Sequence, residues 1–260
     1  MQGDFLGLLL EEDSNVCWKS YLWAVPRGVV KFAVNAGLNT LPSADNLRRW
    51  GKRTSDICSI CNQNSKQTLH HVLSNCSTAL DQGRYTWRHD SVLRTLFDSV
   101  RGQLRDGFVL FSDLIGRDAG GGNTIPRDII STTQRPDLVV LNREQRKVNI
   151  LELTCPWDSN VDRCHQYKMD RYASLVNDLS LDGFSVDLFC VEVSVRGQIT
   201  KANKARFKAF IHKSTNLNRA TGTKILISIS KAALVSSFAI FCARNEQAWA
   251  IQGSMSVNRV

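Results

Sequence analysis

The sequence has no uninterrupted run of about 20 apolar residues, the length that a membrane-spanning helix needs. Its longest apolar stretch, Ile225–Ala243, is broken by Ser228, Ser230 and Lys231, which favours a helix packed inside a protein. No cationic segment follows Met1, so nothing indicates a secretory signal peptide. These absences argue against a membrane protein and against a secreted one.

The eight cysteines therefore do not indicate a disulfide scaffold, and a reducing compartment is the simpler interpretation. The chain carries 33 Lys and Arg against 24 Asp and Glu, a formal charge of +9 with a pI near 9.3. That balance favours a polyanionic partner such as nucleic acid, although many other basic enzymes share it. At 260 residues the chain can bury one or two cores, and it has no evident internal repeat.

Two apolar runs, 137–141 and 148–153, are separated by a polar connection and predict a β-hairpin. An even loop places Asp137 opposite Glu152 on one face of the sheet, with Cβ atoms about 5 Å apart. Two carboxylates there repel each other unless a cation lies between them. The pair predicts a metal site. Acids at solvated strand ends, in a shifted register, are the alternative that the pair alone leaves open.

Residues 160–181 predict a helix with one apolar stripe. Lys168 occupies the middle of that stripe, where an apolar residue belongs, and a lysine is seldom buried without a partner. A helix packed back on the hairpin would direct this ammonium at the two carboxylates. The alternative is a lysine that extends along the helix surface to water.

Arg135-Pro136-Asp137, fourteen intervening residues, and then Glu152-Leu153-Thr154 resemble the core of PD-(D/E)XK restriction-like nucleases. That resemblance implies an α/β sandwich with a mixed sheet, in which Asp137 and Glu152 hold Mg²⁺ or Mn²⁺. Thr154 departs from the pattern, because a lysine usually stands at that position.

In the restriction-like endonuclease of site-specific non-LTR retrotransposons, the lysine comes instead from the following helix, within a Lys-x-x-Lys/Arg-Tyr pattern. The segment from Lys168 through Arg171 to Tyr172 resembles that form. The resemblance implies catalytic roles for Lys168 and Tyr172 beside the two acids.

A second group of candidate ligands lies upstream, at Cys58, Cys61, His71 and Cys76. Thiolates and imidazole at this close spacing suit tetrahedral Zn²⁺. A redox dithiol and scattered core cysteines are the alternatives. His70 competes with His71, since adjacent side chains point in different directions.

The stretch Thr68–Cys76 is similar to the CCHC zinc knuckle that follows the reverse transcriptase in the same retrotransposons, where the second histidine is the ligand. Residues 41–53 and 83–93 look like the segments that bracket it. The resemblance implies three parts: a helical tail of the reverse transcriptase region at 1–54, the knuckle at 55–80, and the endonuclease with its C-terminal helices at 81–260. The chain has no Tyr-x-Asp-Asp motif, so it lacks the polymerase site of such an element.

Basic residues cluster around the knuckle and the candidate nuclease site. Trp50, Tyr85 and Trp87 are interleaved with them and either stack on bases or pack in the core. The residues predicted to contact nucleic acid are Arg48, Arg49, Lys52, Arg53, Arg84, Arg88, Arg135, Arg171 and Arg196.

Periodicity and breaker residues predict the remaining elements. Helices are expected at 15–36 (two pieces joined at Pro26), 43–50, 86–104, 200–212 and 223–247, strands at 107–111 and 184–193, and a loop at 115–134. The predicted function is a divalent-metal DNA endonuclease in the nucleus that nicks target DNA for insertion, with element RNA and a separate reverse transcriptase as further partners. An inactive nucleic-acid-binding remnant is the alternative.

Overall fold

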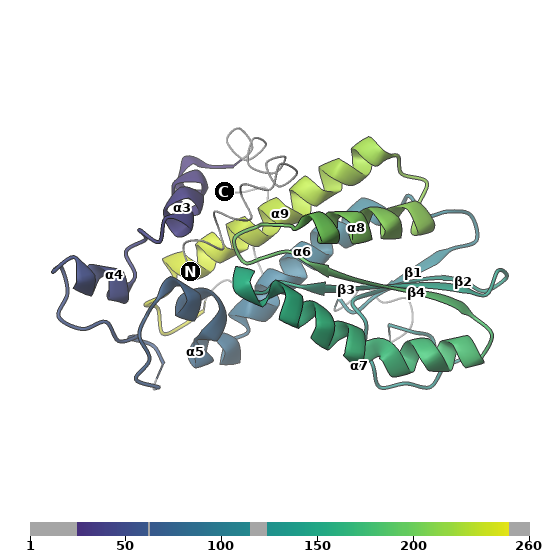
Figure 1. Cartoon of the computed structure of the whole chain (residues 1–260), viewed down its shortest axis with the longest axis horizontal. Helices are drawn as coiled ribbons and strands as arrows, with labels where there is room; N and C mark the ends of the chain where they lie inside the picture. The colour runs from purple at the N-terminus through teal and green to yellow at the C-terminus, as the bar shows by residue number, and fades with distance from the viewer. Residues whose placement is uncertain (1–24, 62, 115–123, 250–260) are drawn as a thin grey trace.

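The computed structural model describes residues 25–61, 63–114 and 124–249 (Figure 1). The first predicted helical piece, Cys17 and the first part of the predicted loop lie outside the described residues.

A four-stranded mixed sheet forms the centre of the molecule, in the order β1-β2-β3-β4. The strands are β1 (Val109–Ser112), β2 (Leu138–Asn142), β3 (Lys147–Thr154) and β4 (Ser185–Glu192). β1, β2 and β3 are antiparallel neighbours, whereas β3 and β4 run parallel and are joined through a helix. The predicted mixed α/β class and its four strands are confirmed.

The hairpin between β2 and β3 has the predicted register. Asn142 pairs with Lys147 and Leu138 pairs with Leu151. One step further along the same ladder places Asp137 opposite Glu152. Apolar residues on both faces of β2 are buried, as expected for a strand that helices cover from both sides.

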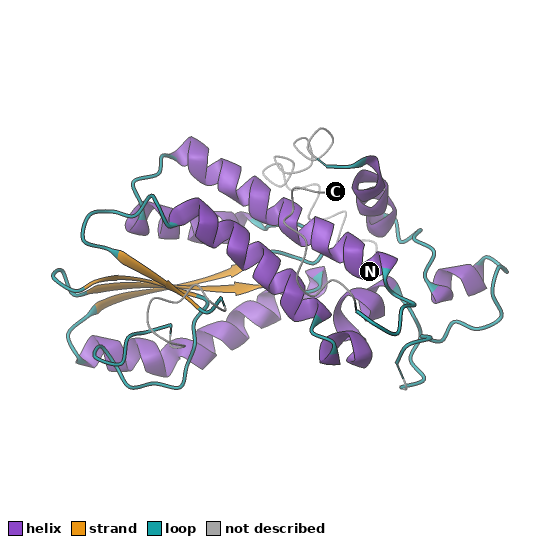
Figure 2. Ribbon diagram, turned by 180° about the vertical axis from the view of Figure 1, so that it is seen from behind, coloured by secondary structure: helices purple, strands orange, loops and turns teal. Residues whose placement is uncertain are grey.

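Helices cover both faces of the sheet (Figures 1 and 2). On one face lies α7 (Val161–Leu181), whose buried Tyr172, Leu175 and Leu179 pack against alternate residues of the strands. The opposite face carries α6 (Arg84–Val100), α8 (Lys201–Ser214) and α9 (Arg219–Cys242). Within the described residues the predicted helices form, although α6 ends four residues earlier than expected.

In the part of the chain that the structure describes, one helix, α9, is long and apolar enough to cross a membrane by length and composition alone. It packs on α6, α3 and α8, and 61% of its most apolar window is buried. This is the packing helix that the sequence predicts. The helix begins four residues before its predicted start. Asn218 caps it by accepting a hydrogen bond from the Thr221 amide at 2.9 Å.

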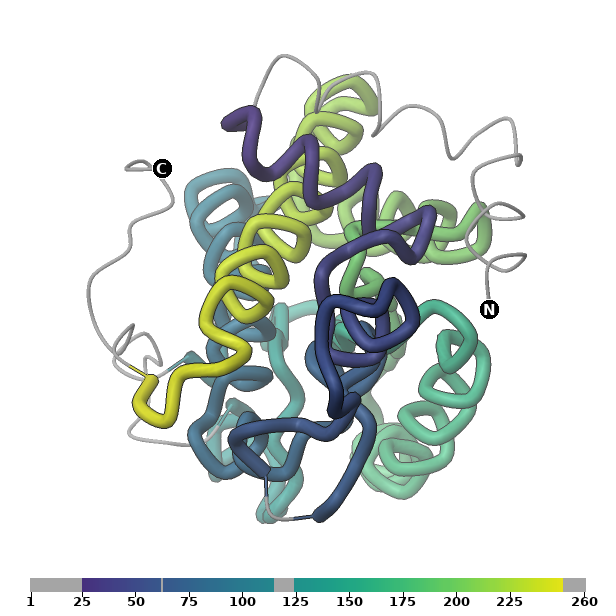
Figure 3. The backbone as a smooth tube through the Cα atoms, turned by 90° about the vertical axis from the view of Figure 1, so that its left-hand side faces the viewer, coloured from purple at the N-terminus to yellow at the C-terminus, as the bar shows by residue number. Residues whose placement is uncertain are grey.

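The N-terminal elements gather at one end of α9. α3 (Arg27–Gly37) begins directly after Pro26 and packs across α9 (Figure 3). α4 (Ala44–Arg49) is capped by Ser43 as predicted. The short elements η1 (His71–Asn75), α5 (Ser77–Asp81) and η2 (Asp158–Asn160) complete the described secondary structure.

Replacement of a central core side chain tests this arrangement. Leu151 on β3 is fully buried, so Leu151→Ala should lower the free energy of unfolding by about 2–5 kcal/mol through lost burial and a cavity. Leu181→Ala is the matched control, because that side chain is 79% exposed. Urea denaturation measures both. Equal stability of the two variants would contradict the placement of β3.

Candidate functional site

Four metal-type ligands, Cys58, Cys61, His71 and Cys76, come together near α5. Their ligand atoms all lie within 4.8 Å of one another and all four residues are buried. His71 Nε2 lies 3.5 Å from Cys61 Sγ. Among the described residues no other group of three or more Cys, His, Asp or Glu ligands gathers so closely.

Local structure explains how these ligands converge. The Cys58 amide donates to the Ser65 carbonyl at 2.9 Å, in a small hairpin that carries the two first cysteines. Thr68 accepts a hydrogen bond from the His71 amide at 3.1 Å, where η1 begins. His70 turns the other way and lies with its ring 4.9 Å from the ring of Trp157. His71 is therefore the histidine of the cluster, as the sequence predicts.

The electrostatics of the cluster fit a dication. A hydrogen bond from the Cys76 thiol lowers the pKa of Cys58 to about 3, whereas the same bond and burial raise the pKa of Cys76. Burial of more than one thiolate costs free energy, and a cation bound between the sulfurs would offset that cost. Soft sulfur donors and one imidazole in a closed, buried set suit structural Zn²⁺.

Hydrogen bonds join the zinc cluster to α6. The Tyr85 hydroxyl accepts a hydrogen bond from the Cys76 amide at 3.0 Å and lies 3.2 Å from the His71 carbonyl. The Trp87 ring meets the Trp249 ring edge-on at 5.4 Å. Of the aromatics interleaved with basic residues, these two pack inside the protein, whereas Trp50 is 40% exposed.

Three of the arginines predicted to contact nucleic acid are buried and form contacts within the protein. Arg84 donates to two carbonyls just after α9, each at 2.7 Å. Arg88 donates to a carbonyl of η1 at 2.9 Å. Arg196 donates to Asp158 at 2.6 Å. Their guanidinium groups are used inside the fold and do not face a ligand.

The other basic candidates reach the surface to different extents. Arg48, Arg49 and Lys52 are exposed and Arg53 is partly so. Arg135 and Arg171 are exposed near the acidic pair. Their role in binding nucleic acid stays a prediction.

The two predicted acids meet at the start of the hairpin. The Asp137 amide donates to Glu152 Oε2 at 3.2 Å, and the Leu153 amide donates to Asp137 Oδ2 at 2.7 Å. Asp137 is 6% exposed and Glu152 is 3% exposed. The structure thus brings both carboxylates to one buried place.

Lys168 of α7 reaches this pair. Its ammonium forms an ion pair with Glu152 Oε1, and its side chain is 19% exposed. The alternative, in which Lys168 extends away to water, is excluded. Burial raises the pKa of Glu152 to about 7, and the charge of Asp137 adds to the rise, against the lowering by Lys168.

Tyr172 lies beneath the acids and does not face outward. Its hydroxyl donates to the Arg135 carbonyl at 3.1 Å, two residues before Asp137. Burial, together with the charges of Glu152 and Asp137, raises its pKa, so the phenol stays protonated. This contact gives Tyr172 a positioning role for the chain that enters β2. Arg135 in turn donates to Asp113 at 2.7 Å.

Two residues at this place had no part in the sequence prediction. His89 of α6 lies with Nε2 3.3 Å from Asp137 Oδ2. Burial opposes its charged form, but the carboxylates of Asp137 and Asp90 outweigh it and raise the pKa of His89. Glu192, at the end of β4, is fully buried and lies 3.1 Å from His165 of α7. Two features of the sequence could have indicated these residues. Glu192 is an acid at the end of a strand, and His89 and Asp90 are adjacent on a helix.

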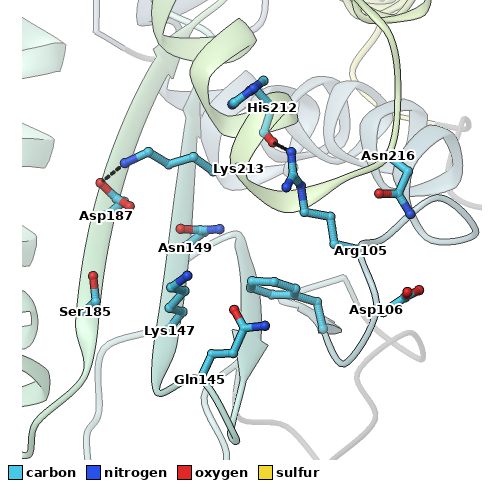
Figure 4. Close-up of a pocket in the computed structure, with 11 residues that line it drawn as sticks. Arg105, Asp106, Gln145, Lys147, Asn149, Ser185, Asp187, His212, Lys213 and Asn216 are labelled. Atoms are coloured by element: carbon cyan, nitrogen blue, oxygen red, sulfur yellow. Dashed lines mark hydrogen bonds and ion pairs between the residues drawn. The ribbon is translucent and has the colours of Figure 1, made fainter.

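A separate polar depression of about 550 Å³ lies at the other end of the sheet (Figure 4). In it Lys213 pairs with Asp187 at 2.6 Å, and Arg105 donates to the His212 carbonyl. Lys147 lines it at the first position of β3, five residues from Glu152 and on the opposite face. Five residues of strand span about 17 Å, so this depression and the acidic pair are separate places.

Comparison with known protein families supports zinc binding by the cluster of Cys58, Cys61, His71 and Cys76. A family profile described as zinc-binding in reverse transcriptase matches residues 7–82, which include all four Cys and His ligands. No curated protein matches the chain. The chain therefore contains a zinc-binding region of the kind associated with reverse transcriptases, and this agrees with an origin in a retrotransposon polyprotein.

Replacement of the adjacent histidines tests the zinc assignment. His71→Ala removes one of four ligands, so the purified variant should retain little zinc and lose stability around the cluster. His70→Ala removes only the contact with Trp157 and should keep about one zinc per chain. Elemental analysis of the two proteins measures the difference. The assignment fails if His71→Ala keeps its zinc.

Proposed function

We propose that this chain is a divalent-metal-dependent DNA endonuclease of the restriction-like PD-(D/E)XK type, which nicks target DNA for retrotransposon insertion. The observation that carries the proposal is the convergence of Asp137, Glu152 and Lys168. Asp137 directly precedes β2, Glu152 lies on β3 and Lys168 lies on α7. A purely structural ion pair would need only one of the acids.

The order of elements around the three residues supports the proposal. A helix (α6), three antiparallel strands, a helix (α7) and a parallel strand (β4) follow one another along the chain. That is the order expected from the resemblance in the Asp137 and Glu152 motif. The zinc-binding match adds a second link, to reverse transcriptases, from a different part of the chain.

The residues at the acidic pair fit a hard dication. Asp137 and Glu152 offer carboxylate oxygens, the ligands that Mg²⁺ and Mn²⁺ take. In the structure each carboxylate has a cationic neighbour, Lys168 on Glu152 and His89 on Asp137. A bound metal would neutralise the negative charge of the two acids. In the structure Lys168 and His89 balance that charge.

The chemistry follows from these positions. A metal ion held by the two acids would neutralise charge on the scissile phosphate and lower the pKa of a bound water. Lys168 would then donate to a phosphate oxygen in place of Glu152 and would stabilise the charge that develops in the transition state. Tyr172 holds the Arg135 carbonyl and so keeps Asp137 in place.

The partners follow from charge and from the zinc-binding match. Arg135 and Arg171 are exposed beside the acids and would contact the phosphates of target DNA. Arg48, Arg49 and Lys52 are exposed near the zinc cluster and would contact the same DNA or the element RNA. The polymerase activity would come from a separate reverse transcriptase, and insertion places the protein in the nucleus.

A nicking assay on supercoiled plasmid with Mg²⁺ or Mn²⁺ tests the proposal. Asp137→Asn and Lys168→Met should each lower the rate by at least about 100-fold, because each removes charge that acts on the transition state. Asp162→Asn and Lys201→Met are matched controls on exposed positions and should cut at the wild-type rate.

Cutting that survives Asp137→Asn would contradict the assignment. A wild-type chain that binds DNA tightly but does not nick it would instead identify an inactive nucleic-acid-binding remnant.

A further inference from the structure

His89 approaches the acidic pair from a different element than the other residues do. It lies on α6, and its Nε2 is 3.3 Å from Asp137 Oδ2. Its side chain is 25% exposed, whereas that of Asp137 is 9% exposed. The imidazole is thus more exposed to solvent than the carboxylate that it contacts.

The distance fits two ligands of one ion. Ligand atoms about 2.1 Å from a metal and at right angles to each other lie about 3 Å apart. Nε2 of His89 and Oδ2 of Asp137 have nearly this separation. No displacement of α6 is therefore needed for both atoms to bind the same ion.

Asp90 supplies the second feature of a metal-binding histidine. Its Oδ1 lies 3.0 Å from His89 Nδ1. A histidine that binds a metal usually donates its other ring N–H to a carboxylate, which fixes the tautomer. A bound ion would displace the proton from Nε2, while Asp90 would hold the remaining proton on Nδ1, so that the Nε2 lone pair would face the ion.

We propose that His89 is a third ligand, beside Asp137 and Glu152, of the metal ion in this site, and that it makes the site select Mn²⁺ over Mg²⁺. The inference rests on the proposed function for the existence of that metal site. Imidazole suits first-row transition metals, whereas Mg²⁺ prefers oxygen ligands and retains its waters. Two carboxylates alone would give no such preference.

Glu152 completes the ligand set only when it exchanges partners. In the structure its Oε1 is paired with Lys168, and its Oε2 accepts the Asp137 amide. Release of Lys168 from Glu152 frees one carboxylate oxygen for the ion and the ammonium for a phosphate. Asp137 would exchange its contact with the His89 N–H for the ion, and His89 would lose its Nε2 proton in the same exchange.

Pulsed electron paramagnetic resonance of Mn²⁺ bound to the full, zinc-loaded chain tests the proposal. The wild-type protein should show coupling to a directly bound ¹⁴N, and His89→Ala should lose it. The Mn²⁺ affinity should fall by at least about tenfold in His89→Ala, and the Mg²⁺ affinity, measured by competition, by about threefold or less. His212→Ala, on an exposed histidine, is the matched control and should keep the coupling.

His89→Gln separates a ligand from a positioning residue. Glutamine can still donate a hydrogen bond to Asp137 but offers no imidazole nitrogen. A preference for Mn²⁺ that survives in His89→Gln would overturn the proposal, since a hydrogen bond would then be sufficient. Retained zinc and an unchanged circular dichroism spectrum show that each variant is folded.

Parallel nicking assays distinguish this inference from the proposed function. Mn²⁺ bound through Asp137 without nitrogen coupling overturns the role of His89, even if the chain cuts DNA. Nitrogen coupling that depends on His89 supports the inference, even if no cutting occurs. Absence of any Mn²⁺ binding that depends on Asp137 overturns it.

Discussion

Two carboxylates on neighbouring strands destabilise a sheet unless positive charge or hydrogen-bond donors compensate them. At Asp137 and Glu152 the hairpin itself supplies only two backbone amides. The cations come from helices in both layers, Lys168 from α7 and His89 from α6. This requirement therefore joins the two helical layers at one end of the sheet, and neither helix can shift without leaving an acid uncompensated.

The zinc cluster depends on the same helix. Within one turn of α6, Tyr85 binds the chain around Cys76, Arg88 binds η1, and His89 reaches Asp137. The segment after α9 closes the other side, since the side chain of Gln67 donates to Asn245 at 2.9 Å and lies 4.0 Å from Cys58 Sγ. The cluster is thus part of the main packing and not an independent appendage.

The sequence predicts best what depends on short-range pattern. The polar loop between two apolar runs gives the hairpin register, and the stripe around Lys168 gives the helix that reaches Glu152, because both depend on neighbours within a few residues. The spacing from Cys58 to Cys76 gives the zinc ligands for the same reason. The sequence pattern does not give the helix boundaries, and α9 starts at Arg219 because Asn218 caps it.

What the sequence does not reveal depends on partners that are distant along the chain. Arg84 and Arg196 resemble surface phosphate contacts until the fold supplies the carbonyls after α9 and the carboxylate of Asp158. His89 is similar, since its partner Asp137 lies 48 positions away. A basic residue beside an aromatic has the same local pattern whether it binds DNA or the interior of its own protein.

The contacts of Tyr85 and His89 are four residues apart on α6. Four residues of α-helix rise about 6 Å, and an α-helix neither stretches nor bends sharply without a break in its hydrogen bonds. Helix α6 therefore fixes the distance between the zinc cluster and the acidic pair. Any strand of nucleic acid that touched both would meet the two places at a constant spacing, whatever its sequence.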